Sequence, residues 1–211
     1  MTKLRTIEQE ARRQYGSTVL GVDEVGRGCL AGPIFAAAVT LSYRSISHLK
    51  TEHLHLIRDS KTLSREQRIK AASIVSKSSM SWAIGMSSTR EIESLGLSKA
   101  NFLAMKRAIA LCPPPNAVLI DGKQTIPGLK VPQIPIVKGD SKTYCIAAAS
   151  IIAKVARDKH MERLHKSDPH YGFDRNVGYG TKEHLLALKK HGPSLHHRKN
   201  FAPIKDFDVH L

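Results

Sequence analysis

The chain has 211 residues, of which 41% are hydrophobic and 24% charged, as in a globular protein with a sizeable core. Its 33 Lys and Arg residues outnumber its 18 Asp and Glu residues, so the formal net charge is +15 at pH 7 and favours a polyanion such as nucleic acid as partner. A membrane partner is disfavoured, because no stretch approaches the roughly 18 apolar residues that a span needs and no basic amphipathic helix stands out.

The first half of the chain predicts a helix, two strands and a polar connection. The helix covers residues 4–15, and apolar runs over 19–23 and 34–41 predict strands separated by a turn over 26–33. We interpret residues 43–56 as a loop with one helical turn, because they are mainly polar.

The remaining predicted elements alternate between helices and strands. Ser64 and Gln67 form a capping box that starts a helix to about residue 77, and Thr181 caps a last helix that Gly192-Pro193 ends. Between them we predict a strand over 81–87, a short helix near residue 91, a helix over 99–111, strands over 117–121 and 133–137, and a long helix over 141–165. This order indicates an α/β fold with a mixed sheet and helices packed on its faces.

The three cysteines, Cys29, Cys112 and Cys145, form neither a CxxC pair nor a zinc-binding spacing. We therefore expect reduced, mostly buried thiols, as in cytosolic proteins. The first residues lack the apolar run of a signal peptide. A cytoplasmic location is expected, and a monomer, because nothing in the sequence indicates an oligomer.

Four carboxylates lie at or directly after predicted strands: Asp23, Glu24, Asp121 and Asp140. Strand ends of one sheet can converge even when they are far apart in the sequence. Burial of the adjacent Asp23 and Glu24 is costly without a cation, which favours metal binding there, whereas Asp140 alone is equally well explained as a cap. Mg²⁺ and Mn²⁺ prefer such oxygen ligands, and two ions roughly 4 Å apart suit phosphodiester hydrolysis.

The segment Gly26-Arg27-Gly28 directly follows the first carboxylate pair. The next glycine is Gly32, so the spacing is not GxGxxG, and the chain contains no GxxxxGK[ST] motif. We interpret the segment as a turn whose backbone lies close to a ligand, with Arg27 on a phosphate. The alternative is a tight turn with an exposed Arg.

Several signals are weaker. Lys61 and Lys142 each follow a serine, as phosphate contacts often do, although a surface loop explains them equally well. Tyr179 lies between two glycines, so its ring is either exposed for stacking or part of the core. We interpret the basic run over 196–199 as a solvated, phosphate-facing tail and Asp158 as a helix-surface carboxylate.

With these motifs the chain resembles ribonuclease HII, the bacterial type 2 ribonuclease H. The matching segments follow the family's order through nearly the whole chain: GVDEVGRGCLAGP at 21–33, DSKTLS at 59–64, LIDGK at 119–123, IVKGDSKTYCIAAASIIAKVARD at 136–158, YGF at 171–173, GYGTKEHL at 178–185 and HGPSLHHRKNF at 191–201. The resemblance implies a ribonuclease H-like fold, with a five-stranded mixed sheet flanked by helices. It also implies a catalytic part over 1–166 and a helical, basic C-terminal part over 167–211 that contacts the substrate.

The resemblance further implies cutting of the RNA strand in RNA–DNA hybrids and incision 5′ to single ribonucleotides in duplex DNA, leaving 5′-phosphate and 3′-hydroxyl ends. The family's metal site, for Mn²⁺ or Mg²⁺, maps onto Asp23, Glu24, Asp121 and Asp140, and we expect Asp23 to bridge two ions. The loop that senses the 2′-hydroxyl maps onto Gly26, Arg27 and Gly28, and the junction-sensing tyrosine maps onto Tyr179. Lys61 and Lys142 are expected phosphate contacts.

Two positions depart from the family pattern. Val177 stands where Lys is usual, which removes one phosphate contact, and Cys29 stands where Pro is common, which leaves the turn less rigid. Neither position is one of the carboxylates.

Three rival interpretations have specific objections. A type 3 ribonuclease H, which handles single ribonucleotides poorly, generally lacks the arginine found here as Arg27. A DNA nuclease of the same fold, such as a junction resolvase, has no need of the glycine-arginine loop together with Tyr179. A non-catalytic nucleic-acid-binding protein would gain nothing from four carboxylates, which weaken phosphate binding when no metal is present. A sliding-clamp contact through the C-terminal residues is a weaker expectation, because no clear clamp-binding motif is present.

Overall fold

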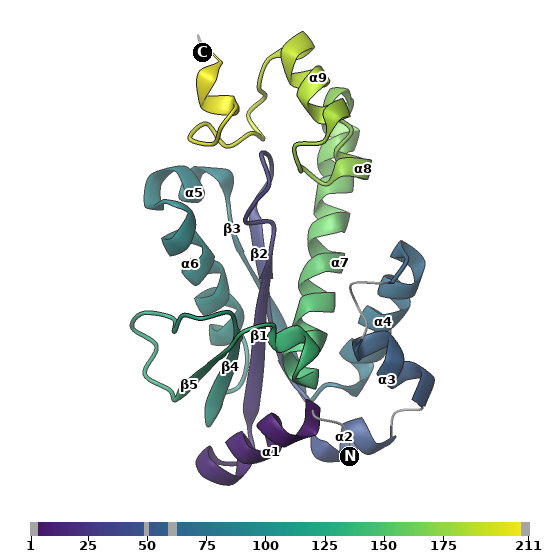
Figure 1. Cartoon of the computed structure of the whole chain (residues 1–211), viewed down its shortest axis with the longest axis vertical. Helices are drawn as coiled ribbons and strands as arrows, with labels where there is room; N and C mark the ends of the chain where they lie inside the picture. The colour runs from purple at the N-terminus through teal and green to yellow at the C-terminus, as the bar shows by residue number, and fades with distance from the viewer. Residues whose placement is uncertain (1–3, 49–50, 59–62, 208–211) are drawn as a thin grey trace.

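The computed structural model describes residues 4–48, 51–58 and 63–207. Its centre is a five-stranded sheet in the order β3-β2-β1-β4-β5 (Figure 1). The strands are β1 Val19–Val25, β2 Ile34–Thr40, β3 Ser81–Ser87, β4 Ala117–Asp121 and β5 Gln133–Ile136. Strands β1, β2 and β3 pair antiparallel, whereas β4 pairs parallel with β1 and β5, so the sheet is mixed as predicted.

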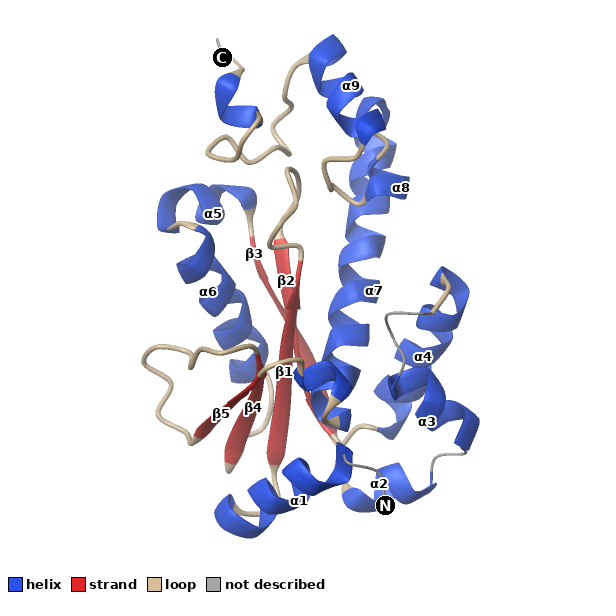
Figure 2. Ribbon diagram, in the orientation of Figure 1, coloured by secondary structure: helices blue, strands red, loops and turns tan. Residues whose placement is uncertain are grey.

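Helices cover both faces of the sheet (Figure 2). Helix α6, Leu97–Ala110, packs on one face, and helix α7, Tyr144–Ser167, packs on the other. Because both faces are covered, every residue of β2 is buried. The other helices are α1 Leu4–Tyr15, α2 Tyr43–His48, α3 Thr51–Arg58, α4 Arg65–Ser78, α5 Thr89–Leu95, α8 Phe173–Asn176 and α9 Lys182–His191.

The segment expected to be a loop with one helical turn, over 43–56, instead forms the two helices α2 and α3. Ile46 and Ile57 are buried in one core cluster with residues of α4 and α7. The prediction was wrong because long-range packing stabilises these short helices, and a local polar composition does not reveal such packing.

The predicted caps are confirmed. Ser64 caps α4 in a complete capping box with Gln67, and Thr181 caps α9, which ends at Gly192. Helix α7 begins later than expected, because residues Gly139–Ser141 form a separate 3₁₀ turn before it.

The first turns of α7 are held close to the sheet and to α1. A side chain at Gly21 of β1 would lie 2.3 Å from the Cys145 carbonyl carbon, so only glycine permits this approach. On α1, Glu8 accepts a hydrogen bond of 2.7 Å from the Cys145 backbone amide, where the helix dipole favours a negative charge. Burial nevertheless raises the pKa of Glu8.

The C-terminal segment packs on the distal half of α7 and on the loop after β1 (Figure 1). Leu30 and Ala31 of that loop share a core cluster with Phe173 of α8 and Leu188 of α9. The basic run over 196–199 is therefore not a wholly solvated tail as expected, because His197 and Arg198 are buried within this packing.

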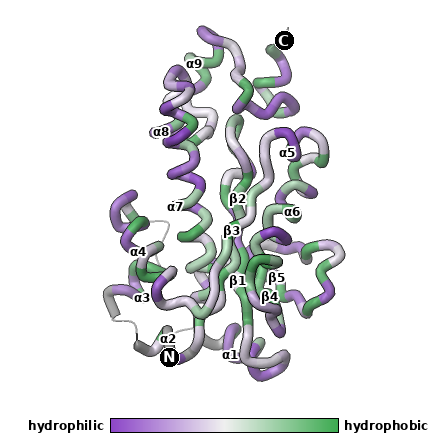
Figure 3. Tube along the Cα trace, turned by 180° about the vertical axis from the view of Figure 1, so that it is seen from behind, coloured by the Kyte–Doolittle hydropathy of each residue, from purple (hydrophilic) through white to green (hydrophobic). Residues whose placement is uncertain are grey.

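Apolar residues follow the sheet and the first half of α7, whereas the second half of α7 is largely hydrophilic (Figure 3). Its first half therefore lies in the core, whereas most of its second half is at least partly exposed and only Arg157 and Met161 there are buried. Among the described residues, no helix is long and apolar enough to cross a membrane.

Candidate active site

Three of the four predicted carboxylates lie at one end of neighbouring parallel strands. Asp23 and Glu24 lie near the end of β1, and Asp121 is the last residue of β4. Asp140 lies in the 3₁₀ turn that follows β5. Carboxyl ends of parallel strands meet at the same edge of a sheet, which is why these segments converge.

Asp23 is in an environment that opposes its ionisation. Its side chain is only 6% exposed, and burial, followed by the charges of Glu24 and Asp121, raises its pKa well above the usual value. Hydrogen bonds from Ser150 of α7 and from the Glu24 amide, at 2.7 Å, oppose that shift. Burial also raises the pKa of Glu24, against the effect of Arg27. Such a group of buried like charges is stabilised by a cation.

Asp121 connects β4 to the turn that contains Asp140. Its Oδ1 atom accepts a hydrogen bond of 2.6 Å from the Gly139 amide, and Asp140 is itself buried. In residues 4–48, 51–58 and 63–207, no three His, Cys, Asp or Glu side chains are close enough to form a ready-made metal site. The carboxylates therefore lie near one another without being grouped around one point.

The glycines of the Gly26-Arg27-Gly28 loop differ in what the fold requires of them. Gly26 has a φ of 94°, and a side chain there would lie 2.2 Å from Nε of Arg157. Gly28 has no protein atom within 4 Å of the place a side chain would take. The fold thus requires glycine at position 26, whereas position 28 is open to solvent. Nη1 of Arg27 lies 3.3 Å from Oε1 of Glu24, so this loop contacts the carboxylates.

Two buried arginines hold the longer loop over residues 26–33, of which this segment is the first part. Arg198 donates hydrogen bonds to the carbonyl oxygens of Gly26 at 2.6 Å, Arg27 at 2.8 Å and Gly32 at 2.8 Å. Burial lowers the pKa of Arg198 to about 10. Arg157 of α7 donates similarly to the carbonyl oxygens of Pro33 at 3.1 Å, Ala31 at 3.2 Å and Val177 at 2.8 Å.

Neither arginine has an acidic partner among the ion pairs of the described residues. The two cations thus lie beneath the loop with backbone carbonyl groups as their hydrogen-bond partners. Sequence reasoning missed their role. For Arg157 one signal was available in the sequence: it lies one helical turn after Ala153, so it falls on the buried face of the predicted helix.

Tyr179 lies beside the same loop and is 42% exposed, which favours the exposed alternative over a core tyrosine. The Leu30 amide donates to the Gly178 carbonyl at 2.8 Å, so the segment around Tyr179 is hydrogen-bonded to the loop after β1. Val177, the position that departs from the family pattern, has a φ of 44°, which is unusual for a β-branched residue. Cys29 is fully buried.

A cleft of about 310 Å³ has both Glu24 and Tyr179 in its lining. Arg68, Ser150 and Lys154 also line it. Sequence reasoning missed these last three, because α4 and α7 become neighbours only in the folded chain.

Asp158 organises the cationic side of this cleft. It lies 2.8 Å from Nζ of Lys154 and 3.9 Å from Nη1 of Arg68. Asp158 is thus mostly buried and paired, rather than the surface carboxylate that was expected. Of the predicted lysines, Lys142 is exposed next to the turn of Asp140, and Lys61 lies outside the described residues.

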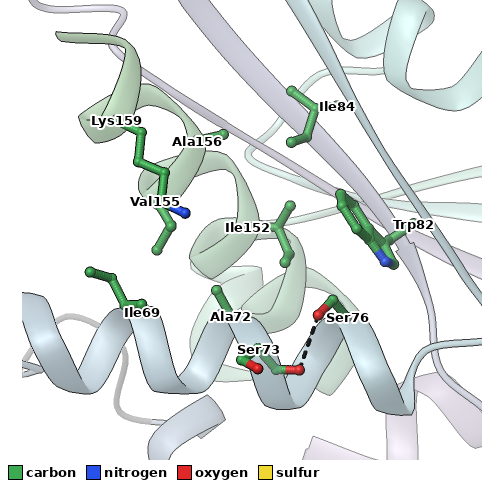
Figure 4. Close-up of a pocket in the computed structure, with 10 residues that line it drawn as sticks. All are labelled: Ile69, Ala72, Ser73, Ser76, Trp82, Ile84, Ile152, Val155, Ala156 and Lys159. Carbon is green, nitrogen blue, oxygen red and sulfur yellow. Dashed lines mark hydrogen bonds between the residues drawn. The ribbon is translucent and has the colours of Figure 1, made fainter. Parts of the chain in front are cut away.

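A second groove, of about 380 Å³, lies between α4, α7 and β3 (Figure 4). Its lining is mainly apolar, with Trp82, Ile69 and Ile152 among the larger side chains, and Lys159 at its edge. No carboxylate lines it, so the cleft beside Glu24 is the better candidate for hydrolytic chemistry.

Comparison with known proteins identifies the family of the chain. The family model described as Ribonuclease HII matches residues 20–203. A ribonuclease HII of Pelagibacter ubique (strain HTCC1062) is 50% identical over 188 residues, covering 88% of this chain and 96% of the relative. A ribonuclease HII of Nitrosospira multiformis is 48% identical over 189 residues, covering 89% of this chain and 91% of the relative.

Solved structures share the fold. A ribonuclease H2 from Pyrococcus horikoshii OT3 matches with a TM-score of 0.74 at 22% identity, covering 90% of this chain and 96% of the other. Bst-RNase HIII in complex with Mn²⁺ matches with a TM-score of 0.68 at 22% identity, covering 92% of this chain and 70% of the other. A PCNA:RNase HII complex from Archaeoglobus fulgidus matches with a TM-score of 0.66 at 23% identity, covering 90% of this chain and 100% of the other. The five-stranded mixed sheet with flanking helices is thus a ribonuclease H-like fold.

Proposed function

The chain belongs to the ribonuclease HII family and is a ribonuclease H, and from this premise we propose that it also incises duplex DNA 5′ to single embedded ribonucleotides. The proposed products are a 5′-phosphate and a 3′-hydroxyl. The proposed substrates are RNA–DNA hybrids and ribonucleotide-containing duplex DNA, and the proposed location is the cytoplasm.

The observation that carries the proposal is the open position at Gly28, next to an arginine that contacts a carboxylate. The 2′-hydroxyl is the one group that marks a ribonucleotide, so an enzyme that selects it must contact it directly. Backbone without a side chain allows a sugar to approach closely. Because Arg27 lies against Glu24, selection of the sugar and cleavage of the adjacent bond would occur side by side.

We assign the catalytic role to Asp23, Glu24, Asp121 and Asp140. Their oxygen atoms suit Mn²⁺ or Mg²⁺, and the raised pKa of Asp23 is the property of a group that a nearby cation would relieve. When bound, two such ions supply an activated nucleophile and stabilise the leaving 3′-oxygen. One or two of these carboxylates together with a substrate phosphate suffice to hold such an ion.

The chain's own cations would hold the phosphate backbone. Arg68 and Lys154 line the cleft beside Glu24, with Asp158 holding them in place. Lys142 is exposed next to the turn of Asp140, and Lys61 remains a predicted phosphate contact. Tyr179, with its exposed ring, would stack on a sugar or base. Residues 167–211 would thus contact the substrate that the part over 1–166 cleaves.

A contact with a sliding clamp is a secondary proposal. The structural neighbour from Archaeoglobus fulgidus is a complex with PCNA. Co-elution of this chain with the clamp of its own cell, lost when residues 208–211 are deleted, would support a contact through the C-terminal residues.

The main proposal is tested on a labelled DNA duplex with one ribonucleotide, beside an all-DNA duplex and a continuous RNA–DNA hybrid. Each is incubated with Mg²⁺ or Mn²⁺ and with wild type or Asp23→Asn. We expect metal-dependent incision 5′ to the ribonucleotide, none on all-DNA, and none by Asp23→Asn. Cleavage of the hybrid alone would reject the single-ribonucleotide activity and favour a type 3 enzyme.

A further inference from the structure

Two buried histidines in the C-terminal part face each other directly. His184 of α9 and His197 are 0% and 1% exposed, and their Nε2 atoms are 3.0 Å apart. The rings of Tyr171 and Phe173 enclose them, with centroids 4.6 Å from His197 and 5.5 Å from His184, respectively. At this separation one of the two nitrogens must carry the hydrogen and the other must accept it.

Backbone groups at both ends decide which nitrogen carries it. The Ser194 amide donates to Nδ1 of His197 at 3.0 Å, so that nitrogen is an acceptor and the ring hydrogen is on Nε2. His197 then donates to Nε2 of His184, whose own hydrogen is on Nδ1. That atom lies 2.9 Å from the Tyr179 carbonyl oxygen, which can only accept. All four ring nitrogens are satisfied with both rings neutral.

The protonation behaviour of the pair agrees with this assignment. Burial lowers the pKa of His184, and it lowers that of His197 to about 3, with the His184 charge as the next cause. The neighbouring His196 also lowers the pKa of His197. Tyr171, whose pKa burial raises, stays neutral beside them. The pair is therefore uncharged at neutral pH.

This hydrogen-bonded chain connects two loops. One end is the carbonyl of Tyr179, which also accepts a hydrogen bond of 2.8 Å from the Thr181 amide and for which His184 is the side-chain donor. At the other end, His197 pairs with Ala31 in a β-bridge, and the next residue, Arg198, holds the Gly26 and Arg27 carbonyls. The pair is thus one connection between Tyr179 and the loop after β1, beside the direct hydrogen bond of 2.8 Å from the Leu30 amide to the Gly178 carbonyl.

We propose that His184 and His197 are positioning residues that fix Tyr179 against the Gly26-Arg27-Gly28 loop and thereby set the preference for a single ribonucleotide over a continuous hybrid. The inference rests on the proposed function of Tyr179. A continuous hybrid presents a 2′-hydroxyl at every position of its RNA strand, so cleavage of it tolerates a displaced tyrosine. A duplex with a single ribonucleotide has one 2′-hydroxyl, which can be bound in only one position. Cleavage of that duplex therefore requires both loops to be correctly placed.

The test compares two amides at position 184. The amide nitrogen of Asn takes the place of Nδ1, so His184→Asn keeps the donor to the Tyr179 carbonyl. The amide of Gln reaches the place of Nε2, so His184→Gln loses that donor. Mutation of the exposed His170, which stacks on His191 in the same region, provides the control as His170→Gln.

We expect His184→Gln to lower kcat/KM on the single-ribonucleotide duplex about tenfold, the effect of one lost hydrogen bond, mainly through kcat. On the continuous hybrid the loss should stay within about threefold, and His184→Asn and His170→Gln should stay near wild type on both substrates. Equal losses on the two substrates, or equal behaviour of the Asn and Gln variants, would overturn the inference.

Amide hydrogen exchange at Tyr179 and Thr181 gives a readout independent of cleavage. Faster exchange in His184→Gln than in His184→Asn would support the positioning role, and equal exchange would reject it. If wild type cleaves hybrids but not single ribonucleotides, the proposed function fails, and this exchange measurement still decides whether His184 positions the loop.

Discussion

The carbonyl oxygen of Gly26 accepts a hydrogen bond of 2.6 Å from Nη2 of Arg198, although the two residues are 172 positions apart. A loop at the end of the first strand is thus held by a residue close to the C-terminus. The loop's shape depends on completion of the whole chain, and the guanidinium satisfies carbonyl groups that would otherwise be buried without a donor.

Replacement of Arg198 should therefore destabilise the protein. We expect Arg198→Met to cost about 3 kcal/mol of unfolding free energy, because it leaves several carbonyl groups unsatisfied. Arg198→Lys should cost less, since one ammonium replaces part of the fork. Urea unfolding checks both values. An Arg198→Met variant as stable as wild type would show that water can replace the guanidinium.

The two glycines of the loop should respond differently to alanine. Gly26→Ala should lower stability by more than about 1 kcal/mol, because φ is positive and the new methyl group collides with Arg157. Gly28→Ala should leave thermal unfolding unchanged but reduce incision at a single ribonucleotide at least about tenfold, because the methyl group enters space left for the sugar. Unimpaired incision by Gly28→Ala would contradict the role given to this position.

Asp23→Asn should stabilise the metal-free protein while abolishing cleavage. The folded-state pKa of Asp23 is raised, so stability from this group is present at low pH and is lost as the pH rises through the folded pKa. At neutral pH the ionised group is unfavourable, and a neutral isostere should recover on the order of 1 kcal/mol.

Addition of Mn²⁺ should reverse this order. Metal that binds the folded state raises its unfolding temperature, so wild type should gain stability as Mn²⁺ is titrated and Asp23→Asn should gain much less. Differential scanning calorimetry with and without metal measures both effects. Equal gains for the two proteins would place the bound metal away from Asp23.

The histidine pair predicts a specific acid sensitivity. Its pKa values are lowered, so the stabilising contribution is complete above the unfolded value of about 6.5 and is lost as the pH falls towards the folded value. For His197 the folded-state pKa is about 3, so its stabilising contribution is lost over the whole pH range between about 6.5 and about 3.

The difference in unfolding free energy between wild type and His197→Asn isolates this effect from that of the buried carboxylates. Their pKa values are raised, so their contribution to stability is lost as the pH rises rather than as it falls. We expect it to shrink below pH 6.5 by up to about 1.4 kcal/mol per pH unit. Urea unfolding at several pH values measures it, and a pH-independent difference would contradict the neutral assignment of His197.

Local patterns predicted most of the secondary structure. Apolar runs such as 34–41 and the capping box at Ser64 determine their elements through nearby residues, so the sequence was sufficient. The placement of carboxylates after strands likewise indicated that Asp23 and Asp121 would converge. Their catalytic roles remain predictions.

Contacts between distant segments account for what was missed. His197 and Arg198 belong to a basic run that looks solvated, and only packing against Leu30 and Ala31 buries them. Lys154 and Arg68 meet because α4 lies against α7, and no spacing within either helix reveals this meeting.

Helix α7 also sets a geometric limit on change in this protein. Ser150 contacts Asp23, Lys154 lines the cleft, Arg157 holds the loop and Met161 packs under Leu30 and Ala31. They recur three or four residues apart, so one stripe of this helix contacts Asp23, the cleft and the loop after β1. Inserting a single residue after Ser150 would turn everything beyond it by about 100° and advance it by about 1.5 Å. Chain length in this stretch is therefore as constrained as residue identity.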